Sequence, residues 1–154
     1  MPARKIATDL RASHMRVGVV AARFNPEVGE ALLKGALAAL ESAGVPPDSI
    51  TVASVPGSLE VPLALQRMAQ TGDYDALVAL GAVIRGETYH FEIVANESAA
   101  GVASVQLEFG TPIGNGILTT DTDVQAHERA EAKGRDAALA AIEMANLLDA
   151  IDEE

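Results

Sequence analysis

The sequence predicts an α/β protein, a three-layer α/β/α sandwich in which helices cover both faces of a four-stranded parallel sheet. Short β-branched apolar runs alternate four times along the chain with longer segments of helical periodicity. The connections expected between them are short, about two to six residues each, as is usual in such repeats. Of the 154 residues, 49% are apolar and 21% are charged, which excludes a disordered chain and is enough for one buried core.

The first strand and helix are expected within residues 15–44. The run at 15–21 (MRVGVVA) predicts a buried strand. Asn25 is expected to cap the helix that follows, because asparagine is a good N-cap and Pro26 fits the first turn. Gly44 is expected to end this helix, just before two prolines.

The second and third strands are expected at residues 50–55 and 75–84. Between them, Ser58 is expected to cap a helix that runs to about Gln70. Because residues 75–84 (DALVALGAVI) are nearly all apolar, they predict a strand that is covered on both faces.

The third helix is expected from about Thr88 to Glu108, with Gly110 at its end. The fourth strand is expected at residues 112–119 (PIGNGILT), where two glycines let backbone or a ligand approach closely.

The last helix is expected to begin at a capping box formed by Thr122 and Gln125. It is expected to run towards Leu148, with a bend or an interruption at Gly134, because glycine is a poor helix former.

Composition excludes several classes of protein. No apolar run reaches the ~18 residues of a membrane-spanning helix, and the basic start lacks the apolar stretch of a secretory signal. We therefore expect a cytoplasmic protein, with residues 1–14 as an arm and 15–154 as one domain. With 22 acidic and 11 basic residues, a formal charge of −11, the chain is not expected to bind nucleic acid. The five aromatic residues are also too few for a base-stacking surface, so the expected ligand is a small molecule or another protein chain. The absence of cysteine excludes disulfides and cysteine-ligated zinc.

Polar residues gather where the predicted strands end. They lie at residues 23–25, 56–60, 82–90 and 119–120. Ligands of parallel sheets bind beyond the carboxyl ends of the strands, so this clustering predicts a site at that edge.

His90 is the candidate general acid or base. An imidazole titrates near neutral pH, and His90 is expected one turn into the third helix, at the ligand edge of the sheet. A histidine on the helix surface is an equally good interpretation. His14 and His127 are interpreted as structural or surface residues.

An anion site is predicted at the start of the third helix. Residues 85–88 (RGET) combine a glycine, free amides and a hydroxyl at a helix N-terminus, where N–H groups and the helix dipole favour a phosphate. Arg129 on the last helix could reach the same pocket. The alternatives are an ordinary capped turn and a surface ion pair.

Three residues near the second strand complete the candidate pocket. Phe24 could stack on a flat ring or pack in the core. Ser58 and Glu60 could hold the hydroxyls of a polyol, although favourable charge in a first helical turn would also explain Glu60. These residues predict a phosphate and polyol pocket with one histidine, and they do not specify a reaction.

The chain resembles the 6,7-dimethyl-8-ribityllumazine synthase family. The resemblance covers about residues 15–148, and the most specific segment is 81–91. The matching segments, in chain order, are 22–25 (ARFN), 55–62 (VPGSLEVP), 81–91 (GAVIRGETYHF), 116–120 (GILTT), 125–130 (QAHERA) and 138–146 (ALAAIEMAN).

The resemblance implies a reaction of riboflavin biosynthesis without a metal or an organic cofactor. Its two small-molecule substrates are 5-amino-6-(D-ribitylamino)uracil, the ribityl pyrimidine, and 3,4-dihydroxy-2-butanone 4-phosphate, the phosphorylated butanone. They are condensed to 6,7-dimethyl-8-ribityllumazine, with release of phosphate and water.

The resemblance also implies residue roles. His90 occupies the acid/base position, and Glu87, Thr88 and Arg129 match the phosphate site. Lys133 is similar to the family's lysine that lies near the pyrimidine ring. The other implied substrate-binding residues are Phe24, Ser58, Leu59, Glu60, the backbone of Ala82, Val83 and Ile84, and Asn115.

The family assembles as homopentamers whose sites lie between subunits, and some members form larger shells. This implies that Asn115, Arg129 and Lys133 come from a neighbouring subunit, and that the arm joins a neighbour's sheet. Two departures are present here: Asn115 stands where many members have an aromatic residue, and the turn before Lys133 is shortened to residues 130–132. We therefore expect a pentamer rather than a shell.

Two other functions fit parts of the sequence. A relative that binds riboflavin or the lumazine without turnover would keep the same fold, although the combination of His90, Arg129 and Lys133 favours an enzyme. The expected layer order is also flavodoxin-like, so an electron carrier that binds flavin mononucleotide is the second alternative.

Overall fold

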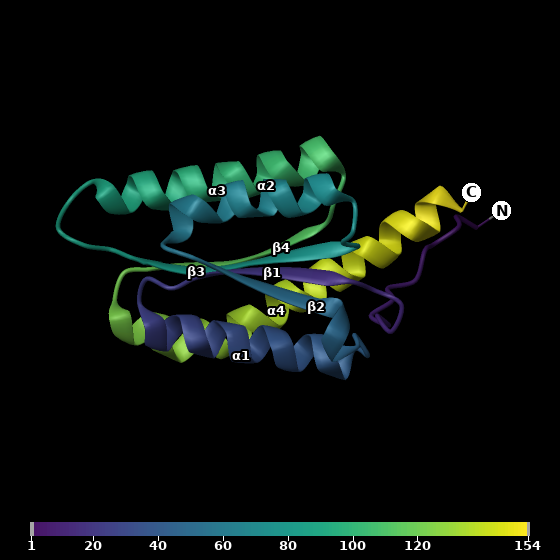
Figure 1. Ribbon diagram of the computed structural model, residues 1–154, viewed down its shortest axis with the longest axis horizontal. Coiled ribbons are helices and arrows are strands. Elements are labelled where there is room, and N and C mark those ends of the chain that lie inside the picture. Colours follow the sequence, from purple (N-terminus) through teal and green to yellow (C-terminus); the bar gives the residue numbers. More distant parts are fainter. Residues whose placement is uncertain (1, 154) are drawn as a thin grey trace.

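The computed structural model describes residues 2–153 and confirms the predicted fold class (Figure 1). Its sheet has four parallel strands, as expected for strand–helix repeats, and their order in the sheet is β2-β1-β3-β4. The elements, in chain order, are β1 (Val17–Ala22), α1 (Pro26–Ser42), the 3₁₀ turn η1 (Pro47–Ser49), β2 (Ile50–Val55), the 3₁₀ turn η2 (Ser58–Glu60), α2 (Val61–Thr71), β3 (Ala76–Ile84), α3 (His90–Phe109), β4 (Ile113–Thr120) and α4 (Asp123–Asp152).

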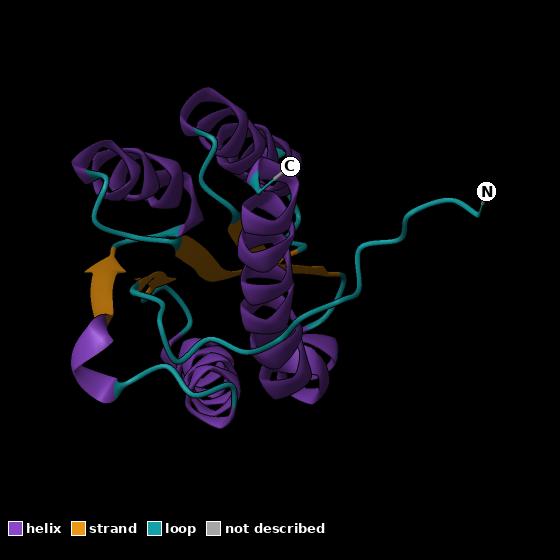
Figure 2. Ribbon diagram, turned by 90° about the vertical axis from the view of Figure 1, so that its right-hand side faces the viewer, coloured by secondary structure: helices purple, strands orange, loops and turns teal. Residues whose placement is uncertain are grey.

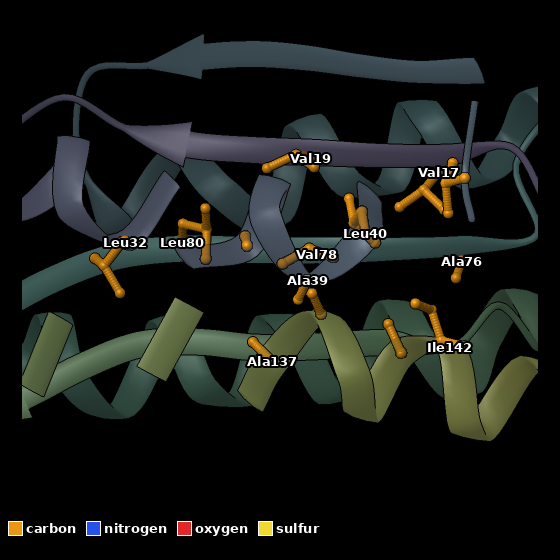
Figure 3. Packing of buried hydrophobic residues seen from close by; sticks show 14 of the residues in the cluster. Val17, Val19, Leu32, Ala39, Leu40, Ala76, Val78, Leu80, Ala137 and Ile142 are labelled. Carbon is orange, nitrogen blue, oxygen red and sulfur yellow. The ribbon is translucent and has the colours of Figure 1, made fainter. Parts of the chain in front are cut away.

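Helices cover both faces of the sheet. The pair α1 and α4 lies on one face and the pair α2 and α3 on the other (Figure 1). Apart from Ile84 at its end, the whole of β3 is buried, which explains its almost uninterrupted apolar sequence. On the face of α1 and α4, Val78 and Leu80 of the sheet pack near Leu32 and Ile142 (Figure 3).

The predicted interruption at Gly134 is wrong, because α4 is one continuous helix from Asp123 to Asp152. Gly134 lies where α4 crosses α1: a Cβ built there would overlap the carbonyl oxygen of Leu32 and stand 3.1 Å from Ala36 N. Gly35 of α1 faces α4 in the same way, because a Cβ built there would stand 2.9 Å from the carbonyl carbon of Glu131. The two glycines let the helix backbones touch.

The glycines of β4 serve the same purpose. A Cβ at Gly114 would overlap the carbonyl oxygen of Ala137 in α4, and one at Gly116 would stand 3.1 Å from the Ala137 side chain. The glycines of the fourth strand were expected to let either backbone or a ligand approach closely. The structure confirms the close approach of backbone.

Two of the predicted helix starts are wrong in detail. Asn25 precedes α1 in the left-handed conformation (φ 64°), and its side chain does not cap the helix. Ser58 begins the turn η2 and caps nothing, while α2 starts later, at Val61.

The other two predictions of helix boundaries concern α3 and α4. The helix α3 begins at His90, so His90 is its first residue and does not lie one turn inside it. Gly110 ends α3 in the left-handed conformation, as expected (φ 62°). The capping box of α4 is confirmed: Thr122 Oγ1 accepts a hydrogen bond from Gln125 N, and Gln125 Oε1 accepts one from Thr122 N.

The N-terminal arm leaves the body of the domain beside the end of α4 (Figure 2). Asn146 of α4 donates hydrogen bonds to the carbonyl oxygens of Asp9 and Arg11, at 2.8 and 3.0 Å, and Ala12 is buried. The later part of the arm is therefore held against the domain. Within the arm, hydrogen bonds from Arg11 lower the pKa of the Asp9 carboxyl to about 2. Within residues 2–153, no helix has both the length and the apolar character needed to cross a bilayer.

Candidate active site

The loops that follow the four strands meet at one end of the sheet, opposite the two termini (Figure 1). All four strands are parallel, so their carboxyl ends share this edge. Polar residues that lie far apart in the sequence therefore come together here, as predicted.

A groove that we call the histidine groove lies at this end, on the side of α2 and α3. Its volume of about 550 Å³ is within the usual range for small-molecule sites. Nine of the predicted site residues line it: Phe24, Ser58, Leu59, Glu60, Ala82, Val83, Ile84, Thr88 and His90.

Backbone hydrogen bonds hold two of the contributing loops together. Arg23 N donates to the Val55 carbonyl oxygen at 2.9 Å, and Phe24 N donates to that of Pro56 at 3.1 Å. The Phe24 ring is 74% exposed, so it is not a core residue. An exposed aromatic side chain at the rim of a groove is available to stack on a planar ligand.

Ser58 lies at the floor of the histidine groove. It is only 5% exposed, and its Oγ has no hydrogen-bond partner among the described residues. Gly81 in β3 makes room for this hydroxyl, because a Cβ at Gly81 would stand 2.5 Å from Ser58 Oγ. A buried hydroxyl without a partner is costly unless a ligand or water satisfies it, which fits a binding role.

The segment between β3 and α3 closes the groove on its other side. Gly86, Glu87, Thr88 and His90 are all exposed, and none of them is paired with another described side chain. Thr88 and His90 line the groove, whereas Glu87 does not. The N-terminal amides of α3 lie immediately after this segment, where they favour an anion.

A second groove, the arginine groove, contains three of the four remaining predicted residues; Glu87 lines neither groove. Asn115 of β4 and Arg129 and Lys133 of α4 line a volume of about 680 Å³. Arg129 Nη1 donates to the carbonyl oxygen of Gln125 at 3.2 Å, and Lys133 follows one turn later on the same face of α4. Phe91 lines both grooves. Within one chain the two sets of residues thus lie on either side of Phe91, in separate grooves.

The sequence did not predict the contacts of Arg85, which lines the arginine groove. Arg85 Nε donates to Asp121 Oδ1 and Nη1 donates to Glu92 Oε1, both at 2.8 Å. Its guanidinium also lies 4.5 Å from the centroid of the Phe91 ring. The two hydrogen bonds raise the pKa of Arg85, so it stays charged. The position of Asp121, directly after the fourth predicted strand, is the signal that could have placed it at this edge.

The side chains of the histidine groove suit an organic ligand. No cluster of three or more His, Cys, Asp or Glu side chains among residues 2–153 could hold a metal ion. The histidine groove combines an aromatic ring, a hydroxyl, a carboxylate and an imidazole. Such a set can bind a planar, hydroxylated ligand and transfer protons.

Comparison with known proteins identifies the family. The family model described as 6,7-dimethyl-8-ribityllumazine synthase matches residues 14–149. A protein of that name from Ralstonia nicotianae is 59% identical over 145 residues, which are 94% of this chain and 88% of the relative. Another from Neisseria meningitidis is 52% identical over 149 residues, or 97% of this chain and 94% of the relative. The chain therefore belongs to the 6,7-dimethyl-8-ribityllumazine synthase family.

Proposed function

We propose that this chain condenses the ribityl pyrimidine with the phosphorylated butanone to 6,7-dimethyl-8-ribityllumazine, releasing phosphate and water. Family membership over residues 14–149 supports the reaction. The observation that carries the proposal for this chain is the histidine groove, in which nine residues from three separate loops and a strand end line one cavity. We also propose that the protein is cytoplasmic, as the sequence predicts.

The ribityl pyrimidine occupies the histidine groove in this proposal. Phe24 stacks on the ring, and the backbone groups at residues 82–84 pair with its polar edge. Ser58 and Glu60 hold the ribityl hydroxyls, which supplies a partner for the buried Ser58 Oγ. Leu59 lines the same wall of the groove.

The phosphorylated butanone lies next to the pyrimidine, with its phosphate at Thr88 and the amides that begin α3. The ring amine attacks the ketone to form an imine with loss of water. Phosphate is then eliminated, which leaves an enol that tautomerises to a ketone. The ribitylamino nitrogen attacks this new carbonyl carbon and closes the second ring with loss of a second water. His90 transfers protons in these steps. Holding the two substrates side by side contributes up to about 7–11 kcal/mol, the main effect available to such a condensation.

Arg129, Lys133 and Asn115 complete the site from a neighbouring copy of the chain. This part of the proposal rests on the separation of the arginine and histidine grooves within one chain. It also rests on large apolar side chains left exposed on α2 and α3, such as Leu63 (66%) and Leu107 (83%), which are available for contact between copies. We propose a homopentamer. The unbroken α4, which replaces the turn usual before Lys133, favours a pentamer over a larger shell.

The reaction is tested by mixing the purified protein with both substrates and following lumazine absorbance and phosphate release. We expect the two products to appear in equal amounts, and His90→Ala to abolish or strongly slow both. His14→Ala is the matched control, because His14 lies in the arm, away from both grooves. Binding of the ribityl pyrimidine without product would favour the binding-protein alternative.

The shared site is tested by complementation between two slow variants. His90→Ala and Arg129→Ala are produced separately and then together in the same cells, and turnover is measured at a low concentration of the phosphorylated butanone. If one site takes His90 from one copy and Arg129 from the next, mixed oligomers contain some intact sites and regain activity. If both residues act from the same copy, coproduction restores nothing.

A further inference from the structure

The segment of residues 86–88 carries Glu87 and Thr88 but makes few contacts of its own. All three of its residues are exposed, and none of them forms a hydrogen bond with another described residue. A Cβ built at Gly86 would meet no atom within 4 Å, so no packing holds this position. The geometry of the segment therefore depends on the residues at its two ends.

Arg85 is the anchor at the start of this segment. Its backbone N–H donates to the Thr120 carbonyl oxygen at 2.9 Å, and its side chain donates to Asp121 and Glu92, both at 2.8 Å. These partners belong to the end of β4, to the loop that follows it and to the first turn of α3. Arg85 thus connects three backbone segments at the edge of the sheet.

The two residues whose carboxylates accept hydrogen bonds from Arg85, Asp121 and Glu92, are themselves held in place. The backbone N–H of Asp121 donates to Gln125 Oε1 at 2.9 Å, as part of the start of α4. Glu92 N donates to the Tyr89 carbonyl oxygen at 3.0 Å, within the first turn of α3. The Phe91 ring beneath the guanidinium gives a third contact at 4.5 Å. Because a guanidinium is planar and presents several donors, it can satisfy both carboxylates at once, which a lysine ammonium on a flexible chain does poorly.

We propose that Arg85 is a positioning residue for the reaction, holding residues 86–88 so that Thr88, Glu87 and His90 face the phosphorylated butanone. This inference rests on the proposed function. The charge of Arg85 is already balanced by two carboxylates, so its role is to place the segment and not to bind the phosphate directly. Displacement of reacting groups by about 1 Å can cost a hundredfold in rate, so even a small shift of this segment matters.

The test compares Arg85→Lys, which keeps the charge, with Asp121→Asn, which removes the charge of one partner at nearly constant shape. We expect each to lower kcat/KM for the phosphorylated butanone about ten- to a hundredfold. The affinity for the ribityl pyrimidine should stay unchanged, because Phe24 and residues 82–84 do not depend on Arg85. Arg67→Lys, an exposed arginine of α2, is the matched control and should change neither quantity.

Amide hydrogen exchange provides a readout that does not need turnover. If Arg85 anchors the segment, exchange becomes faster at the hydrogen-bonded amides on either side of it, those of Arg85, Glu92 and Ile93, in Arg85→Lys and in Asp121→Asn but not in Arg67→Lys. Unchanged exchange, or faster exchange with wild-type kinetics, would overturn the proposal. So would an equal loss of affinity for both substrates together with a lower Tm, which would indicate a general loss of stability. If the wild-type chain makes no lumazine, the proposed function fails, and the exchange comparison still decides whether Arg85 positions the segment.

Discussion

Replacing Gly134 by alanine separates two interpretations of this glycine. If Gly134 weakened α4, as the sequence predicts, alanine would raise the free energy of unfolding by about 1 kcal/mol, because alanine is the better helix former. In the structure, a Cβ at residue 134 would stand 2.8 Å from the carbonyl carbon of Leu32 and 3.1 Å from Ala36 N. Both are backbone atoms, so no side-chain rotation relieves the contact, and α1 must move away from α4.

The size of the effect follows from these two opposing contributions. Forcing an extra methyl group into a packed contact costs about 1–3 kcal/mol, and the rigid backbone partners place this case near about 3 kcal/mol. The gain in helix propensity offsets about 1 kcal/mol. The net loss is about 2 kcal/mol in the free energy of unfolding, which lowers Tm by about 4–8 °C in a chain of this size.

Urea and thermal unfolding of the two proteins measure this loss. The protein concentration must be the same, because assembly of several copies adds to the apparent stability. Ala140→Gly at an exposed position of α4 is the matched control and measures helix propensity alone, with an expected loss of about 1 kcal/mol. An unchanged or raised Tm for Gly134→Ala would refute the close-contact interpretation.

Three further substitutions test the site and one helix start. His90→Ala should slow turnover with only a modest loss of pyrimidine binding, since His90 transfers protons; unchanged kcat would exclude the acid/base role. Arg129→Ala should chiefly raise the KM for the phosphorylated butanone, and an effect limited to the ribityl pyrimidine would show that the phosphate assignment is wrong. Thr122→Ala removes the capping box of α4 and should lower the free energy of unfolding by about 0.5–2 kcal/mol in urea titrations, whereas no loss would mean that other groups satisfy those amides.

Much of the fold could be predicted because its signals are local. The buried β3 follows from ten nearly continuous apolar residues, and β2 was predicted at residues 50–55, where the structure has it. Parallel strands joined by helices place all carboxyl ends at one edge, so the clustering of Phe24, Ser58 and His90 also followed from the order of the elements.

The errors arose where a residue's surroundings come from elsewhere in the chain. Asn25 and Ser58 are good N-caps by composition, but neither side chain caps a helix in the structure. Ser58 begins the turn η2 and is instead buried against Gly81 of strand β3. Residue preferences average over many proteins and contain no information about such a neighbour.

The sequence by itself determined the α/β class, the number of strands and their alternation with helices, the capping box of α4 and the family, because each depends on residues close together along the chain. Only the tertiary structure decided that α4 is unbroken at Gly134, that Arg85 bridges Asp121 and Glu92, and that the site residues of one chain divide between two grooves. The physical reason is the same in each case. These features are contacts between atoms whose separation is set by how helices pack on the sheet, and packing brings together residues that no local pattern connects.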